Sequence, residues 1–341
     1  MKITFQDFQE QGGEAASLSE QIAANRFVHA ALFLGEEGSG KKTLATLAAQ
    51  AMLCRAEGVR PCGICRDCVM TEKLEHPDLI VVSRTRSLTE NTEQKARASI
   101  SVDDIRELIR QCGLRTLDSG KRVVIIQDAD RMTPQAQNCL LKTLEEPPEN
   151  TFFLLLAEHP EALLSTVVSR CRPIRLHPWS DGTVRRALLA AGVPAERAEE
   201  ILPAAAGSIG KALRLSGDEE YWKLRGEVTQ AFFATVQRSE ILRISTAWKD
   251  RKNEAEDIWR MLELTIRQLL RRRLGQRDAM LPAGVSECWK RFSENAEPER
   301  FTLLLDAVAE ARRQTMAAVN FQAVVEQLLF SFMGEGNRWQ A

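Results

Sequence analysis

The chain has 341 residues, of which 27% are charged, as in an ordinary soluble globular protein, and its formal net charge at pH 7 is −1. This length predicts two or three domains, and the near-neutral charge excludes a polyanion-binding surface over the whole chain, so contact with DNA is expected only through a local patch or partner proteins. No apolar run approaches the roughly 18 residues that span a bilayer, and residues 1–10 lack the pattern of a signal peptide. We therefore expect a cytoplasmic protein without a membrane segment.

A glycine-rich loop follows the first apolar run, residues 31–34, which we expect to form a buried strand. In phosphate-binding loops, glycines let backbone N–H groups close around a phosphate at the N-terminus of the next helix. The candidate nucleotide-binding residues are therefore Gly35, Gly38, Gly40, Lys41, Lys42 and Thr43, together with Asp128 from a later strand.

One position of this loop departs from the phosphate-binding pattern. Lys42 stands where the pattern requires a Ser or Thr hydroxyl that binds Mg²⁺, and an ammonium group there would repel the metal. Thr43 does not repair the gap, because one residue further along a helix turns the side chain by about 100°. Two interpretations stay open: a degenerate site for ATP or ADP, or a glycine turn without a ligand.

Four of the eight cysteines lie close together in a polar loop, with the spacing C-x7-C-x2-C-x2-C. They are Cys54, Cys62, Cys65 and Cys68. In a reducing compartment this spacing favours a closed tetrahedral zinc site over disulfides, with unmetallated thiols as the alternative. Four protein ligands leave no open coordination position, so we expect the zinc to be structural.

The following segments alternate between strands and helices. Residues 79–82 are predicted to form a strand, residues 84–98 a polar, exposed and mobile excursion, and residues 102–109 an amphipathic helix with acidic residues at its start. The function of the polar excursion stays open.

The acidic half of a nucleotide site is incomplete. Residues 123–126 predict a buried strand, and Asp128 near its end could reach a magnesium-bound water. ATPases of this build usually place a Glu directly after that Asp to polarise the attacking water. Here the next residue is Ala129, whose methyl group cannot accept a proton or orient water.

Two further strands, at residues 153–156 and 174–176, complete the pattern. The alternation of apolar strands with helices predicts an α/β fold with a parallel sheet and the glycine-rich loop at its carboxyl edge. After residue 178 the sequence predicts only helices. We expect three domains: an α/β domain over residues 1–178 with the cysteine loop at 54–68, a small helical domain over 179–216, and an all-α domain over 217–341.

Several motifs together resemble the clamp-loader branch of the AAA+ family. They are the run Asn-Cys-Leu-Leu-Lys-Thr-Leu-Glu-Glu-Pro-Pro at 138–148, the triplet Ser169-Arg170-Cys171, the four-cysteine loop after a phosphate loop, and the helical tail. The resemblance covers essentially the whole chain. It implies a RecA-like AAA+ domain, a small helical lid domain, and a C-terminal collar domain that assembles with other subunits.

The resemblance also implies partners and a task. The expected partners are the tau/gamma and delta subunits of the DNA polymerase III clamp loader, and through the complex the sliding clamp and primer-template DNA. In that family ATP is used to open the ring-shaped clamp and place it on primed DNA during replication. Arg170, flanked by Ser169 and Cys171, matches the arginine that one subunit presents in trans to ATP held by its neighbour.

Departures from the motor pattern predict a stator-like subunit without ATPase activity of its own. Besides Lys42 and Ala129, residues 157–158 are Ala-Glu where the motors carry threonines that sense the γ-phosphate. Gly210 lies where a motor would place the arginine of its lid. Two alternatives stay open: an active tau/gamma-like ATPase, and a zinc-dependent module that binds nucleic acid.

Overall fold

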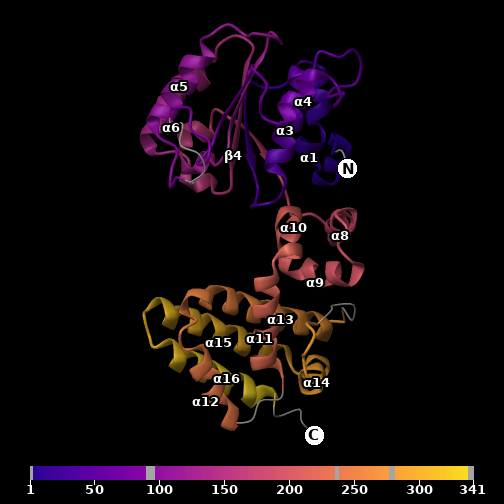
Figure 1. Ribbon diagram of the computed structural model, residues 1–341, viewed down its shortest axis with the longest axis vertical. Helices are drawn as coiled ribbons and strands as arrows, with labels where there is room; N and C mark the ends of the chain where they lie inside the picture. Colours follow the sequence, from indigo (N-terminus) through magenta and orange to yellow (C-terminus); the bar gives the residue numbers. More distant parts are fainter. Residues whose placement is uncertain (1–2, 90–96, 235–237, 276–280, 337–341) are drawn as a thin grey trace. The chain divides into compact units, whose positions relative to one another are not determined.

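The computed structural model describes residues 3–89, 97–234, 238–275 and 281–336 (Figure 1). The chain divides into two compact units. One comprises residues 1–184 with 207–211, and the other comprises residues 185–206 with 212–341.

The first unit is built on one parallel sheet of five strands. The strands are β1 (Ala30–Leu34), β2 (Leu79–Val82), β3 (Arg122–Ile126), β4 (Thr151–Ala157) and β5 (Arg172–Arg175), in the spatial order β2-β3-β4-β1-β5. Apolar runs of Val, Ile, Leu and Phe form these strands because both faces of a parallel sheet are covered by helices. The predicted α/β fold with a parallel sheet is confirmed.

Helices cover both faces of this sheet (Figure 1). The helices of the first unit are α1 (Gly13–Ala16), α2 (Leu18–Ala23), α3 (Lys41–Leu53), α4 (Arg66–Glu72), α5 (Val102–Cys112), α6 (Pro134–Glu145) and α7 (Ser165–Val168), with short 3-10 turns at Phe5–Gln11, Ala129–Arg131 and Pro160–Ala162. Apolar residues of α5 and α6, such as Leu108 and Leu140, pack against Leu32 and Val124 of the sheet. Helices α3 and α4 lie on the opposite side of the sheet in Figure 1.

The ends of the polar excursion are tied to α5 by the carboxylate of Asp104. This buried side chain accepts hydrogen bonds from the Ser87 hydroxyl at 2.6 Å, the Leu88 backbone N–H at 3.1 Å and the Ser101 hydroxyl at 2.9 Å. Arg97 pairs with it at 2.8 Å. The sequence predicts an exposed excursion, but Ser87, Leu88 and Arg97 are only partly exposed because they bind the Asp104 carboxylate. Residues 90–96 of the excursion lie outside the described residues.

The second unit is helical. It contains the greater part of α8 (Asp181–Ala190) and of α10 (Ile209–Gly217), and also α9 (Ala195–Ala205), α11 (Glu219–Phe233), α12 (Arg238–Trp248), a 3-10 turn at Lys252–Glu254, α13 (Ala255–Arg273), α14 (Glu287–Asn295), α15 (Pro298–Met316) and α16 (Phe321–Gly336). Its core is rich in aromatic rings: Phe332 contacts both Phe233 and Trp289 at centroid distances of 5.3 and 5.8 Å. Among the described residues after 178 every regular element is a helix, as the sequence predicts.

The predicted separation of residues 179–216 from 217–341 stays a prediction, since helices of both ranges fall within the second unit. Across the described ranges, no helix combines the length and the apolar character needed to cross a bilayer.

The hydrogen bonds around Asp104 generate a prediction about pH. Burial alone would raise the pKa of Asp104, but hydrogen bonds from Ser87 and Ser101 and the Arg97 guanidinium lower the pKa to about 2 from its usual 3.8. A lowered folded-state pKa contributes stability that is complete above about pH 4 and is lost as the pH falls toward 2. At pH 7, Asp104→Asn should therefore reduce the free energy of unfolding by about 2 kcal/mol.

Urea denaturation at pH 7 and at pH 3 measures this effect. The loss caused by Asp104→Asn should be smaller at pH 3, because the wild-type carboxylate is then partly protonated in the unfolded chain. Asp103→Asn is a matched control on the same helix turn, since the Asp103 side chain is 67% exposed and pairs only with Arg106 among the described residues. Equal losses for the two variants at pH 7 would contradict the account.

Candidate functional site

The glycine-rich loop joins β1 to α3 at the carboxyl edge of the sheet. Leu34 ends the strand, and Lys41 is the first residue of the helix. Gly38 and Gly40 have φ angles of 74° and 101°, a left-handed conformation that residues with a Cβ rarely adopt. The structure thus brings the candidate residues 35–43 together in the geometry of a phosphate loop. Lys42 is exposed.

The ammonium group of Lys41 is bound by the loop itself. Its Nζ donates hydrogen bonds to the backbone carbonyls of Gly35 at 2.6 Å and Glu36 at 2.8 Å, and it pairs with the Glu158 carboxylate at 3.4 Å. Only 11% of the Lys41 side chain is exposed. An ammonium group has three donors, so these three acceptors satisfy it, and the Glu158 charge would repel a phosphate at the same place.

Residues 208–210 pack directly against the backbone of this loop. The Ser208 hydroxyl donates to the Glu37 carbonyl at 2.8 Å, and the Gly210 N–H donates to the Gly38 carbonyl at 3.0 Å. A Cβ on Gly210 would lie 2.7 Å from the Gly38 Cα, so only glycine permits this approach. We call this contact between residues 35–41 and 208–210 the loop clasp. It favours the interpretation of the loop as a turn without a ligand.

The acidic residues near the loop are engaged elsewhere. Asp128 follows β3 and pairs with Arg84 at 3.4 Å. Asp130 accepts hydrogen bonds from the backbone N–H groups of Glu158 and His159 at 3.4 and 3.2 Å. Ala129 is fully buried, and its methyl group is not a base. The position from which motor ATPases polarise water therefore has no carboxylate.

The four clustered cysteines are brought together by two helix ends. Cys54 follows α3, Cys65 caps the N-terminus of α4, and Cys68 lies in the first turn of α4. With Cys62, all four sulfur atoms lie within 4.8 Å of one another. The Cys54–Cys65 and Cys62–Cys68 sulfur pairs are both 3.9 Å apart. A tetrahedral metal with metal–sulfur distances of about 2.3 Å requires sulfurs roughly 3.8 Å apart, so the cluster has metal-binding dimensions.

Burial makes thiolates costly at two positions of this cluster. Backbone N–H groups of Ile64 and Cys65 lower the pKa of the Cys62 thiol to about 6. Burial raises the pKa of the Cys68 and Cys65 thiols. A buried thiolate therefore needs a positive partner, and a metal ion is the usual one.

A hydrogen-bond network supports the cysteine loop, and sequence reasoning missed it. Asp67 is buried and pairs with Arg55 at 3.0 Å and with His76 at 3.5 Å. The Gln50 side chain donates to the Cys68 carbonyl at 2.9 Å. Asp67 lies between Cys65 and Cys68 in the first turn of α4. An acidic residue at the positive end of a helix is the one sign of this network in the sequence.

Arg170 lies at the amino edge of the sheet, after α7. Its Nη1 donates to the Thr166 carbonyl at 2.9 Å, and its Nη2 pairs with Glu145, the last residue of α6. The Arg170 side chain is 32% exposed. Ser169 likewise bonds the Thr166 carbonyl, at 3.2 Å. Cys171 is buried, which raises the pKa of its thiol to about 12, so it is an inert core residue.

Strand register separates Arg170 from the glycine-rich loop of the same chain. β5 pairs with β1 in parallel, with Arg172 opposite Ala31 and Arg175 opposite Leu34. Arg170 precedes this paired segment, whereas the loop follows it, so the two lie beyond opposite ends of roughly 10 Å of strand. Arg170 and the chain's own loop thus lie at opposite edges of the sheet.

Comparisons with known proteins agree with these features. The family model described as DNA polymerase III, delta subunit, matches residues 11–180. The chain is 30% identical over 317 residues to DNA polymerase III subunit delta' of Bacillus subtilis (strain 168), which covers 92% of this chain and 93% of that protein. It is 30% identical over 324 residues to the Escherichia coli (strain K12) subunit delta', covering 90% and 89% of the two chains.

A more local similarity extends to another subunit type. DNA polymerase III subunit gamma/tau of Mycobacterium tuberculosis (strain ATCC 25618 / H37Rv) is 36% identical over 179 residues, or 51% of this chain and 28% of that protein. A solved gamma subunit-related protein from Thermotoga maritima covers 94% of this chain and 99% of its own, with 16% identity and a TM-score of 0.45. The two relatives that are 30% identical over at least nine tenths of this chain are both subunit delta', and the chain therefore belongs to the family of DNA polymerase III subunit delta'.

Proposed function

We propose that this clamp-loader component acts as a stator that presents Arg170 in trans to ATP bound by a neighbouring tau/gamma subunit. The observation that carries the proposal is the position of Arg170. This arginine is partly exposed and precedes β5, whereas the chain's own loop lies at the opposite edge of the sheet. A guanidinium suits this task because it is always charged and contacts phosphate oxygens through a planar fork. Ser169 and Cys171 hold the turn that carries it.

Self-contained ATP hydrolysis is not part of the proposed function. Lys41 is bound by the loop carbonyls and Glu158, and Gly38 is covered by residues 208–210. Lys42 offers no hydroxyl to Mg²⁺, and Ala129 offers no base. The candidate nucleotide-binding residues thus serve as a structural joint in this proposal, and ATP belongs to the partner.

The proposed partners follow from the family. We place tau/gamma and delta subunits beside this chain, and the sliding clamp and primer-template DNA in contact with the assembled complex. The all-α residues 217–341 would supply the collar through which the subunits associate. The formal net charge of −1 agrees with contact to DNA through the complex.

We further propose that Cys54, Cys62, Cys65 and Cys68 hold one structural zinc ion. The sulfur separations fit tetrahedral coordination, and two of the cysteines are buried where an unpaired thiolate would be unstable. Zinc would join the end of α3 to the start of α4 and would leave no position open for substrate.

The zinc proposal predicts that protein purified without chelator contains about one zinc per chain, as measured by atomic absorption. Cys65→Ala should abolish zinc retention and make the loop at residues 54–68 sensitive to protease. Cys288→Ala is the matched control, since this cysteine lies on α14 outside the cluster, and it should retain the metal. Zinc-free wild-type protein would contradict the proposal.

The arginine proposal predicts that Arg170→Ala lowers ATP turnover in a complex reconstituted with tau/gamma and delta subunits. Arginine fingers contribute about 10³ to 10⁵ in rate at one site. Because the complex has several motor sites and only one faces this subunit, total turnover should fall partially, while clamp loading, which needs the sites to work together, should fall much more. Steady-state ATPase and clamp-loading assays measure the two effects.

Arg175→Ala provides the matched control. Arg175 is an exposed arginine at the other end of β5, so its removal should change neither activity. Zinc content and complex assembly should be normal for both variants. Unchanged turnover and loading with Arg170→Ala, or a failure of that variant to assemble, would show that Arg170 does not act as the proposed arginine donor.

A further inference from the structure

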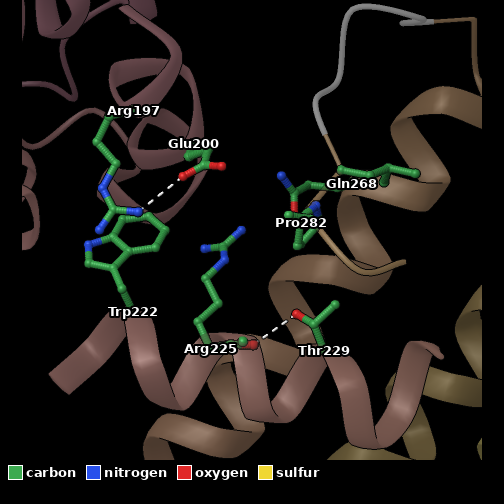
Figure 2. A pocket seen from close by; sticks show the side chains of 10 residues that line it. Arg197, Glu200, Trp222, Arg225, Thr229, Gln268 and Pro282 are labelled. Atoms are coloured by element: carbon green, nitrogen blue, oxygen red, sulfur yellow. Dashed lines mark hydrogen bonds and ion pairs between the residues drawn. The ribbon is translucent and has the colours of Figure 1, made fainter. Parts of the chain in front are cut away.

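The helical second unit contains a cavity that the proposed function does not use. It has a volume of about 160 Å³ and lies between α9, α11, α13 and residues 281–283 (Figure 2). The side chains that matter for its chemistry are Arg197 and Glu200 from α9, Trp222 and Arg225 from α11, and Gln268 from α13.

Arg225 is a buried charge that points into this cavity. Its side chain rises from α11 toward Glu200 and Gln268 in Figure 2, and the residue is only 5% exposed. Within the described ranges it makes no ion pair; its guanidinium has a long hydrogen bond of 3.4 Å to the Tyr221 hydroxyl and lies 5.4 Å from the Trp222 ring. A guanidinium has five N–H donors, so burial leaves most of them in need of an acceptor.

The remaining charged groups of the cavity are already paired with each other. Arg197 stacks on the Trp222 ring at 3.5 Å and donates to the Glu200 carboxylate at 3.1 Å. The Glu200 charge is therefore compensated by Arg197, and among the described residues the three ionised groups leave a surplus of one positive charge, at Arg225. A buried surplus of this kind is stabilised by an anion.

The size of the cavity limits the anion. Pockets for nucleotide-sized or drug-sized ligands usually measure about 300 to 1,000 Å³. The space is thus smaller than a usual nucleotide pocket and matches a single small oxyanion.

We propose that this cavity binds one small oxyanion of the phosphate class, with the Arg225 guanidinium as its principal ligand. A planar fork of N–H donors is the side chain best matched to two oxygens of such an anion. The Gln268 side chain and the Arg197 guanidinium line the same space. The site is separate from the glycine-rich loop and from the cysteine cluster, so it does not depend on the proposed function.

Isothermal titration calorimetry of the full chain with inorganic phosphate, in chloride buffer of constant ionic strength, tests this proposal. We expect saturable binding at one site, and displacement by sulfate, which has the same shape and donor requirements. Arg225→Gln should weaken phosphate binding by at least about tenfold, because a charge-assisted pair of hydrogen bonds is lost. Arg267→Gln, which removes the same charge from an exposed position one residue before Gln268, should bind as the wild type does.

Arg225→Lys keeps the proposal testable if the glutamine variant does not fold. It retains the charge but loses the planar fork, so its affinity should lie between those of the wild type and Arg225→Gln. Circular dichroism establishes that each variant is folded. Absence of saturable phosphate binding, an affinity unaffected by Arg225→Gln or Arg225→Lys, or an equal loss with Arg267→Gln would overturn the proposal.

Discussion

The parallel pairing of β1 with β4 and β5 determines where the groups of the first unit can act. Parallel strands all point the same way, so the loop after β1 and Glu158 after β4 lie at one edge, with Leu34 opposite Ala157. The turn before β5, which carries Arg170, is held at the other edge. This register therefore places Arg170 at one edge of the sheet and the glycine-rich loop at the opposite edge.

The loop clasp holds the glycine-rich loop through contacts within the chain. Glycines at 38 and 40 keep the left-handed backbone that such a loop requires. The Lys41 ammonium, which would otherwise face phosphate oxygens, is satisfied by two loop carbonyls and Glu158. Gly210, with no Cβ, allows residues 208–210 to approach the loop backbone. The same residues thus join the glycine-rich loop to residues 208–210.

Much of the first unit follows from local sequence. The predicted strands at 79–82 and 123–126 agree with Leu79–Val82 and Arg122–Ile126, because a run of β-branched and apolar residues suits only a strand covered on both faces. The spacing of the four cysteines predicts their cluster, because all four are close in sequence. Cys54 at the end of α3 and Cys65 at the start of α4 hold them together in the structure.

The features that escaped prediction involve residues far apart in the chain. Glu145 and Arg170 belong to two separate motifs, and nothing in either indicates that their side chains pair. Residues 208–210 contact a loop about 170 positions earlier, which only the folded chain reveals. The composition of the polar excursion predicts an exposed segment, but some of its residues bind the buried Asp104 carboxylate. The hydrogen bonds and the ion pair to this carboxylate offset the entropic cost of ordering those residues. Pairing of this kind is decided by tertiary structure and has no periodic pattern.

The most direct test of the account is whether the purified chain binds ATP, because the division of labour between loop and arginine requires that it does not. Calorimetric titration of the isolated chain with ATP should be done with and without Mg²⁺, in phosphate-free buffer and against a tau/gamma subunit as a positive control. The account predicts no saturable nucleotide binding at the glycine-rich loop under either condition, and no change in heat upon Lys41→Ala. Tight binding that is strengthened by Mg²⁺ and abolished by Lys41→Ala would contradict it.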